Sequence, residues 1–261
     1  MPEERDSPVT LPLGDWWEDF RTAAGFLTRL PMVGPARTLP GALTQASRCF
    51  PLVGILVGVI AGAVYAIAAD CNLTPLIAAA LAVAAGIIVT GALHEDGLAD
   101  FADGLGVRGE RQAKLAAMRD SHIGVFAMLA LALSLILRVS ALASLGQPLQ
   151  VLGALIAAHA GARAILPWAM YQENPARSDG LAVAAGRPSR ATAGAALVIG
   201  AVALVVALGP GAGFVAALGA ALAMGLLPLA RRELGGITGD VLGAVEQSAE
   251  VLILLAIVAA R

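Results

Sequence analysis

Charged side chains are scarce in this 261-residue chain. Only 14% of its residues are Asp, Glu, Lys or Arg, whereas a soluble domain carries about 25%. Hydrophobic residues make up 58% of the chain, and the mean hydropathy is +0.80. Because that much apolar surface is unfavourable in water, the expected solvent is a lipid bilayer. The shortage of charge excludes an ordinary soluble domain, and no nucleic-acid partner is expected.

Aromatic residues and cysteines are few as well. Aromatics account for 4% of the chain, and Cys49 and Cys71 are the two cysteines. Two are too few for a disulfide framework or a zinc site, so both are expected to be inert. The chain also lacks HExxH, Walker, GxGxxG and GxSxG motifs, which leaves zinc, nucleotide-loop and serine-nucleophile chemistry unsupported. The acidic, polar first twenty residues are not typical of a signal peptide.

Long apolar stretches fill most of the remaining sequence, and small residues in them favour closely packed membrane helices. A span needs about 17–25 residues. We expect seven spans, at 49–69, 75–93, 123–145, 149–171, 191–208, 211–230 and 241–260. The predicted fold is therefore an all-α, polytopic transmembrane bundle. Residues 49–261 are expected to form its single transmembrane domain, and residues 1–48 a cytoplasmic segment with an amphipathic helix at 14–30 along the membrane interface.

Positive charges alternate along the chain. Arg and Lys occur in the N-terminal segment and in every second connection after it, whereas 70–74, 146–148 and 209–210 hold none. Connections rich in Lys and Arg stay cytoplasmic. The N-terminus is therefore expected in the cytoplasm. The oligomeric state is left open, and a homo-oligomer is one of the alternatives.

An acidic cluster between Thr90 and Gly106 holds most of the remaining polar information. Its four carboxylates, with no basic residue among them, are Glu95, Asp96, Asp100 and Asp103. The three aspartates follow an i, i+4, i+7 pattern, which puts them on one face of a helix. Glu95 would then point toward a neighbouring helix or, from a bend at Gly97, toward the same ion.

Crowded carboxylates repel one another, and partial removal from water makes the repulsion worse. Cations relieve it, and ligands that are all oxygen suit Mg²⁺, Mn²⁺ or Ca²⁺. The alternative is a solvated acidic loop. Interleaved apolar residues such as Leu98 and Phe101 argue against that loop, so we expect a metal site at the cytoplasmic face.

Two further segments carry candidate site residues. Arg119, Asp120 and Ser121 precede the third expected span. Arg119 is a candidate for phosphate binding, helped by free backbone N–H groups where the span begins. Asp120 is either a metal ligand or the N-cap of that span. Near the last expected span, Asp240 follows Thr238 and is either an N-cap or a ligand, and the nearby glycines allow close backbone approach.

Further polar positions lie within the expected spans or beside the acidic cluster. Glu246 and Glu250 would lie within the last span and need partners, with Arg163 or Arg138 as candidates. Arg163 is also a candidate for substrate binding. His94 flanks the acidic cluster and is either a general base or, more often for such a residue, a histidine satisfied by hydrogen bonds.

Five blocks together resemble the adenosylcobinamide-GDP ribazoletransferase family, also called cobalamin synthase. They read FLTRLP from Phe26, FPLVG from Phe50, TGALHEDGLADFADG from Thr90, MRDSHIG from Met118 and TGDVLG from Thr238. They occur in the family's order and span nearly the whole chain. The HEDGLAD–xx–DG block is highly specific.

The resemblance implies a Mg²⁺-dependent inner-membrane phosphotransferase, for which Mn²⁺ is a second candidate cation. It implies that adenosylcobinamide-GDP reacts with α-ribazole or its 5′-phosphate to give adenosylcobalamin or its 5′-phosphate, plus GMP. The family's motifs fall on Glu95, Asp96, Asp100 and Asp103 as metal and catalytic residues, on Arg119, Asp120 and Ser121 on the phosphate side, and on Thr238, Gly239 and Asp240 in the closing motif. The attacking group is a hydroxyl of the ribazole. Either Asp103 or Glu95 accepts its proton, and the sequence leaves this choice open.

Two other classes of function compete with this hypothesis. A cation- or proton-coupled transporter predicts carboxylates that continue across the membrane and inverted repeats, and the sequence shows neither. A structural subunit without chemistry leaves the clustered acids unexplained.

Overall fold

The computed structural model describes residues 16–32 and 41–261, and this part of the chain is helical without a β-strand. An isolated bridge pairs Pro175 with Ile237. The helices are α1 (Trp16–Leu27), α2 (Ala42–Ala46), η2 (Ser47–Cys49), α3 (Phe50–Asp70), α4 (Pro75–Thr90), α5 (Leu93–Gly106), α6 (Arg111–Ala117), α7 (Val125–Leu145), α8 (Pro148–Ala164), α9 (Leu166–Gln172), α10 (Leu181–Ala185), α11 (Arg190–Leu208), α12 (Pro210–Ala223), α13 (Leu226–Leu234) and α14 (Gly239–Ala259). The all-α prediction is confirmed.

Six helical segments in the described residues are long and apolar enough to cross a membrane. They are Ala42–Asp70, Val125–Leu145, Pro148–Gln172, Arg190–Leu208, Gly213–Leu234 and Gly239–Ala259. A seventh crossing is present if α4 and α5, which meet at 91°, count together. The prediction of about seven spans is confirmed in this form, with one span broken.

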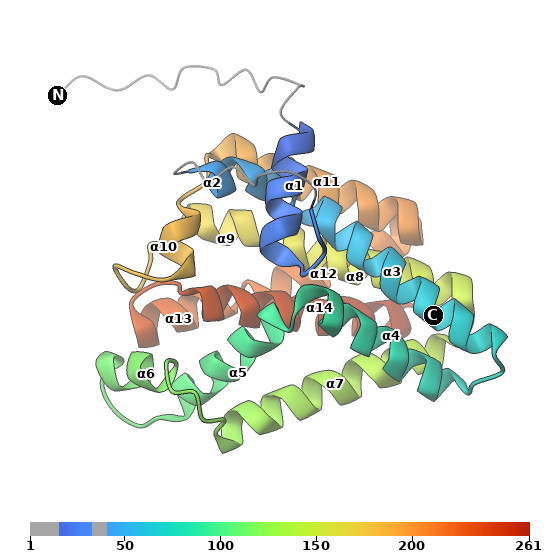
Figure 1. The fold of residues 1–261 in the computed structure, drawn as a ribbon, viewed down its shortest axis with the longest axis horizontal. Helices are drawn as coiled ribbons and strands as arrows, with labels where there is room; N and C mark the ends of the chain where they lie inside the picture. Colours follow the sequence, from blue (N-terminus) through green and yellow to red (C-terminus); the bar gives the residue numbers. More distant parts are fainter. Residues whose placement is uncertain (1–15, 33–40) are drawn as a thin grey trace.

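The break between α4 and α5 determines where the acidic cluster lies. The expected second span ran on to residue 93, but α4 ends at Thr90 because Gly91 (φ 65°) and Ala92 (φ 58°) are both left-handed. At 1.5 Å per residue α4 is about 24 Å long, most of an apolar layer about 30 Å thick. We therefore treat α4 as the membrane-crossing part of this bent pair, and α5 as the part that turns away from it sideways (Figure 1).

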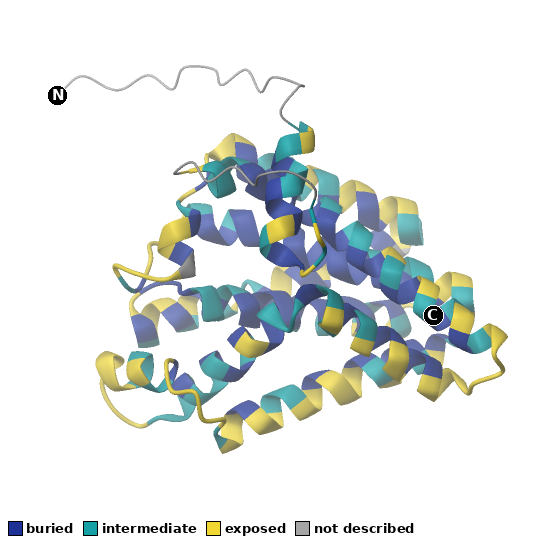
Figure 2. Cartoon of the chain, viewed as in Figure 1, coloured by how far each residue is buried: buried dark blue, intermediate teal, exposed yellow. Residues whose placement is uncertain are grey.

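Helices α8 and α14 form the buried centre of the bundle, and the helices around them carry more exposed residues (Figure 2). Small residues allow the close packing that the sequence predicts. A Cβ added to Gly58 of α3 would lie 2.7 Å from the Cα of Ile156 in α8. The outer face of α7 is apolar and exposed, with Leu133 and Ile136 about 60% accessible. Such a surface suits contact with lipid.

Helix α1 packs on the bundle with one face. Ala23, Ala24 and Leu27 are buried, and Asp19 forms a buried ion pair with Arg48 of η2 at 2.6 Å. The predicted amphipathic helix is thus present over Trp16–Leu27, although its placement at a membrane interface stays a prediction. Residues 1–15 and 33–40 of the expected N-terminal segment lie outside the described residues.

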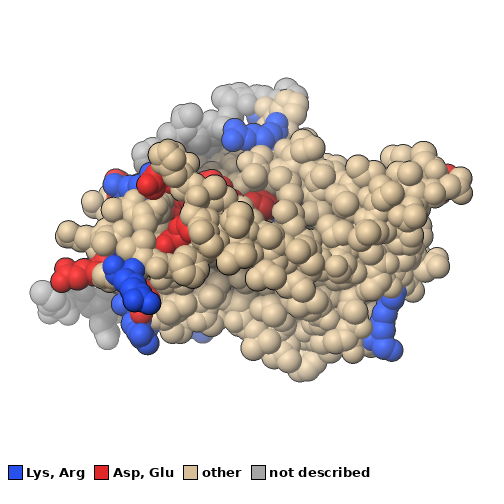
Figure 3. Space-filling model, turned by 90° about the horizontal axis from the view of Figure 1, so that it is seen from below, with Lys and Arg blue, Asp and Glu red and all other residues tan. Residues whose placement is uncertain are grey.

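Charged side chains gather at one end of the molecule. Figure 1 places α5, α6, α10 and α13 at the left, and the α3–α4 connection and the C-terminus at the right. Seen from below, most red and blue side chains lie at that left end, and uncharged residues cover most of the remaining surface (Figure 3). The clustering agrees with the alternation of charge in the sequence.

Candidate functional site

The acidic face of α5 borders an open cavity of about 470 Å³. Asp96 is exposed, Asp100 and Asp103 are half-buried, and all three line this cavity together with Arg119, Asp120 and Ser121. Helix α5 confirms that the i, i+4, i+7 spacing is helical, and it brings the first two predicted motifs together. The two motifs lie side by side because α6 and the following turn fold back along α5.

The closing motif reaches this site through a close crossing of α5 and α14. A Cβ added to Gly97 would lie 3.0 Å from the Cα and 3.0 Å from the carbonyl oxygen of Asp240. A Cβ added to Gly243 would lie 3.0 Å from the Cα of Gly97. The two glycines therefore let the backbones touch, which sets Asp240 beside the acidic face of α5.

The carboxylates at this crossing act on one another. Burial, together with the negative charges of Asp240, Asp96 and Asp103, raises the pKa of Asp100 to about 7. An ordinary aspartate has a pKa near 3.9. The ionised cluster is therefore unfavourable in the protein alone, and a bound cation would relieve it.

Asp103 has a second role that the sequence does not reveal. Its Oδ2 accepts a hydrogen bond from the Gly124 N–H at 2.6 Å, and its Oδ1 accepts one from the Ala127 N–H at 2.9 Å. These donors belong to the beginning of α7, where free N–H groups need partners. The alternative that Asp120 caps this span is wrong, because the N-cap is Gly124 and no N-cap side-chain bond forms there.

Glu95 turns away from the aspartates, as the helical geometry predicted. Its Oε1 accepts from Nη1 and Nη2 of Arg138 in α7, both at 3.2 Å. Its Oε2 is buried and has no hydrogen-bond partner among the described residues. Glu95 thus lies at the floor of the cavity with one oxygen anchored to a neighbouring helix.

The phosphate-side residues are more exposed. Arg119 donates two hydrogen bonds from Nη2 to the Asp179 carboxylate, at 2.6 and 2.7 Å. The Asp120 Oδ1 accepts from the His122 N–H at 3.0 Å and lies 2.7 Å from His122 Nδ1. These contacts lower the pKa of Asp120. Ser121 is exposed and lines the cavity, and its side chain forms no hydrogen bond with another described residue.

Thr238, rather than Asp240, is the N-cap of α14. Its Oγ1 accepts from the Val241 N–H at 3.2 Å and donates to Asp240 Oδ2 at 3.2 Å. The N-cap alternative for Asp240 is therefore wrong. Asp240 is instead a half-buried carboxylate in the first turn of α14, and Arg177 Nη2 lies 3.6 Å from its Oδ2. Sequence reasoning missed Arg177, because nothing near it marks it apart from other basic residues of its loop.

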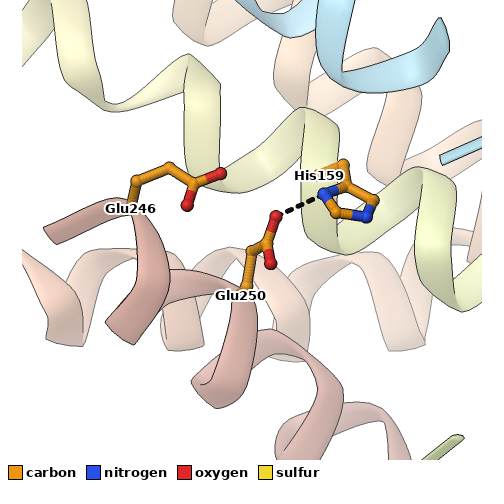
Figure 4. A group of neighbouring side chains, drawn as sticks. All are labelled: His159, Glu246 and Glu250. Carbon is orange, nitrogen blue, oxygen red and sulfur yellow. Dashed lines mark ion pairs between the residues drawn. The ribbon is translucent and has the colours of Figure 1, made fainter. Parts of the chain in front are cut away.

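A second group of ionisable residues is buried between α5, α7, α8 and α14. The sequence predicted partners for Glu246 and Glu250, and the structure provides them. Arg163 Nη1 lies 2.6 Å from Glu246 and 3.1 Å from Glu250. Arg138 Nη1 lies 3.1 Å from Glu250. His159 also contacts Glu250 (Figure 4).

His159, Glu246 and Glu250 have ligand atoms within 4.8 Å of one another, which makes them a geometric candidate for a metal. Figure 4 shows the two carboxylates and the imidazole turned toward a common centre. Arg163 already supplies positive charge there, since its Nη1 contacts both glutamates. A divalent ion beside a buried guanidinium is unfavourable, so we interpret this group as a structural ion-pair network.

Two predicted substrate ligands belong to that network. Arg163 is 1% exposed and does not line the acidic cavity. His94 is buried, with Nδ1 3.3 Å from Arg163 Nη2 and 3.5 Å from Glu246 Oε2. His94 therefore matches a satisfied histidine better than a free general base. Arg163 contacts His94 but does not reach the acidic cavity, because its charge pairs inward with α14.

The donor set at the cavity fits Mg²⁺. Asp96 and Asp100 offer carboxylates that no basic residue pairs among the described contacts, and burial together with the neighbouring carboxylates raises the pKa of Asp100. Protein sites for Mg²⁺ commonly use one or two carboxylates and leave the other positions to water and substrate phosphates. A site of this kind does not need three preformed ligands.

Comparisons with known proteins identify a family and relatives that match over most of the chain. Residues 19–258 match the family model described as cobalamin-5-phosphate synthase. A Bradyrhizobium diazoefficiens protein named adenosylcobinamide-GDP ribazoletransferase is 47% identical over 238 residues, covering 91% of this chain and 92% of the relative. A Mesorhizobium japonicum protein of the same name is 45% identical over 244 residues, with 91% and 92% covered. No solved structure is significantly similar. The chain belongs to the cobalamin-5-phosphate synthase family.

Proposed function

We propose that this chain joins adenosylcobinamide-GDP to α-ribazole or α-ribazole 5′-phosphate in the α5 cavity and releases GMP. The observation that carries the proposal is the open cavity where Asp96 and Asp100 lie beside Arg119, with Asp240 held close by the α14 crossing. The names of the relatives, which match over most of the chain, support the choice of substrates. Family membership favours this transferase over the transporter alternative.

The reaction is a phosphoryl transfer. A hydroxyl oxygen of the ribazole bonds to the phosphorus next to the corrinoid's arm, and the bond from that phosphorus to the departing GMP breaks. Asp103 and Glu95 of α5 are the two candidates to take the hydroxyl proton. Transfers of this type depend mainly on positioning and on stabilising the charge that develops.

The protein's residues divide these tasks. Asp96 and Asp100 would hold Mg²⁺ or Mn²⁺, whose charge would offset that of the diphosphate. Arg119 offers a planar, permanently charged donor set to the leaving phosphate, and releasing it requires breaking its exposed pair with Asp179. Asp103 and Glu95 fix the position of α5 through α7, because their oxygens accept from Gly124, Ala127 and Arg138.

We place the protein in the cell inner membrane with this cavity on the cytoplasmic side. The end that carries the cavity also carries the positively charged connections, which stay cytoplasmic by rule. Both substrates are large and polar, so a cavity that opens to the cytoplasm suits them.

The test is GMP release from adenosylcobinamide-GDP in membranes that contain the full chain. We expect Asp96→Asn and Asp100→Asn each to lower kcat by about 10²–10³-fold, as for the loss of a group that stabilises transition-state charge. Asp70→Asn is the matched control, because Asp70 is an exposed carboxylate at the opposite end of the bundle. Undiminished GMP release from both cavity variants would refute the catalytic assignment.

A further inference from the structure

A second pocket, of about 760 Å³, lies beside the acidic cavity, and its charge is opposite. Arg111, Arg119 and Arg177 line it together with a single carboxylate, Asp179. Arg119 also lines the acidic cavity, so the two spaces share a wall. The basic pocket is formed by α6 and by the loop that follows α9.

The three arginines differ in how fully their donors are used. Arg111 Nη2 donates to the carbonyl oxygen of Ala176, and Arg119 is paired bidentately with Asp179. Arg177 makes one long hydrogen bond, from Nη2 to the Leu115 carbonyl oxygen at 3.4 Å, and its Nε is buried without a partner in the described part of the chain. A buried, unpaired guanidinium donor is unfavourable, so Arg177 is the arginine best prepared to accept a ligand.

We infer that this basic pocket binds a phosphomonoester, the 5′-phosphate of the ribazole acceptor, through Arg177; the inference rests on the proposed function. Charge favours a different pocket for each of the two phosphate groups, which are the diphosphate of adenosylcobinamide-GDP and the 5′-phosphate of the acceptor. The diphosphate that shares the acidic cavity with a metal tolerates carboxylates, whereas a metal-free monoester dianion is repelled by Asp96 and Asp100. The neighbouring pocket offers that dianion the fork of donors that suits a phosphate.

The shared wall makes the arrangement compatible with one substrate. The hydroxyl and the 5′-phosphate of an acceptor belong to the same ribose ring, so one must lie a single sugar away from the other. Arg119 lines both pockets, so the two spaces are neighbours. Arg177 Nη2 also lies 3.6 Å from Asp240 Oδ2, so the basic pocket is next to the carboxylates of the acidic cavity.

The experiment compares two acceptors in membranes that contain the full chain and Mg²⁺, with adenosylcobinamide-GDP saturating. The measured quantity is kcat/KM for α-ribazole 5′-phosphate divided by kcat/KM for α-ribazole. We expect Arg177→Gln to lower this ratio by about tenfold to hundredfold, the range for losing a charge-assisted hydrogen bond. Arg187→Gln is the control: Arg187 lies in the same connection between α9 and α11, donates to the Tyr171 carbonyl oxygen at 2.7 Å and is absent from both pockets.

A ratio that Arg177→Gln leaves unchanged, or an equal loss with both acceptors, would overturn the inference. A wild-type protein that releases no GMP with either acceptor would instead refute the proposed function. A second measurement needs no variant: ribose 5-phosphate should inhibit the wild-type enzyme at least about tenfold more strongly than ribose when α-ribazole is the acceptor. Equal inhibition by the two sugars would also overturn the inference.

Discussion

Gly243→Ala is the smallest substitution that tests whether the α5–α14 crossing sets the catalytic geometry. The added Cβ would lie 3.0 Å from the Cα of Gly97 and 3.0 Å from the carbonyl oxygen of His94. Favourable contacts between carbon atoms lie at about 3.5–4.0 Å, so the helices must separate by about 0.5–1 Å. Overpacking of this kind costs about 1–3 kcal/mol, and a displacement of about 1 Å lowers rates by about a hundredfold.

We therefore expect Gly243→Ala to lower kcat for GMP release by about tenfold to hundredfold while the protein still folds. Thermal unfolding in detergent should show only a modest loss of stability. Gly194→Ala in α11 is the control, since no atom lies within 4 Å of its added Cβ. It should stabilise by about 0.5–1 kcal/mol through the preference of alanine for helices. Wild-type kcat in Gly243→Ala would refute the argument that this contact positions the site.

Further predictions concern the metal, the pH and two anchoring residues. EDTA should abolish GMP release, and Mg²⁺ or Mn²⁺ should restore it. Because the pKa of Asp100 is raised to about 7, protons compete with the cation. The apparent affinity for Mg²⁺, measured from activity, should fall about tenfold per pH unit below 7 and level off above it. Asp103→Ala should destabilise by about 0.5–2 kcal/mol in chemical unfolding, because the N-terminus of α7 loses its cap. Arg163→Gln should cost about 3–5 kcal/mol in the same assay, because it leaves Glu246 and Glu250 buried without this partner.

Periodicity and composition predicted the features of this protein that depend on local sequence. Apolar length located the spans, and the i, i+4, i+7 spacing placed Asp96, Asp100 and Asp103 on one face of α5. Charge alternation matched the gathering of charged side chains at one end of the bundle. Each of these follows from the 3.6-residue period of a helix or from transfer into lipid, which neighbouring residues alone determine.

Features that depend on contacts between residues far apart in the chain were not predicted from the sequence. The end of the second span was missed because Ala92 adopts a left-handed conformation that its side chain does not signal. Asp103 caps a helix 21 residues later, and Arg177 meets Asp240 from a different loop. Arg163 was expected near substrate, but its partners on α14 draw it inward. Such pairings are set by tertiary packing, which spacing along the chain does not encode.

Anomalous scattering from Mn²⁺ in crystals or ordered arrays of the full chain would test the central claim most directly. The claim is that Asp96 and Asp100 hold a divalent cation against a diphosphate. We predict a single strong peak within coordination distance of these carboxylates, strengthened when adenosylcobinamide-GDP is present. A peak among His159, Glu246 and Glu250 with none at α5 would contradict it.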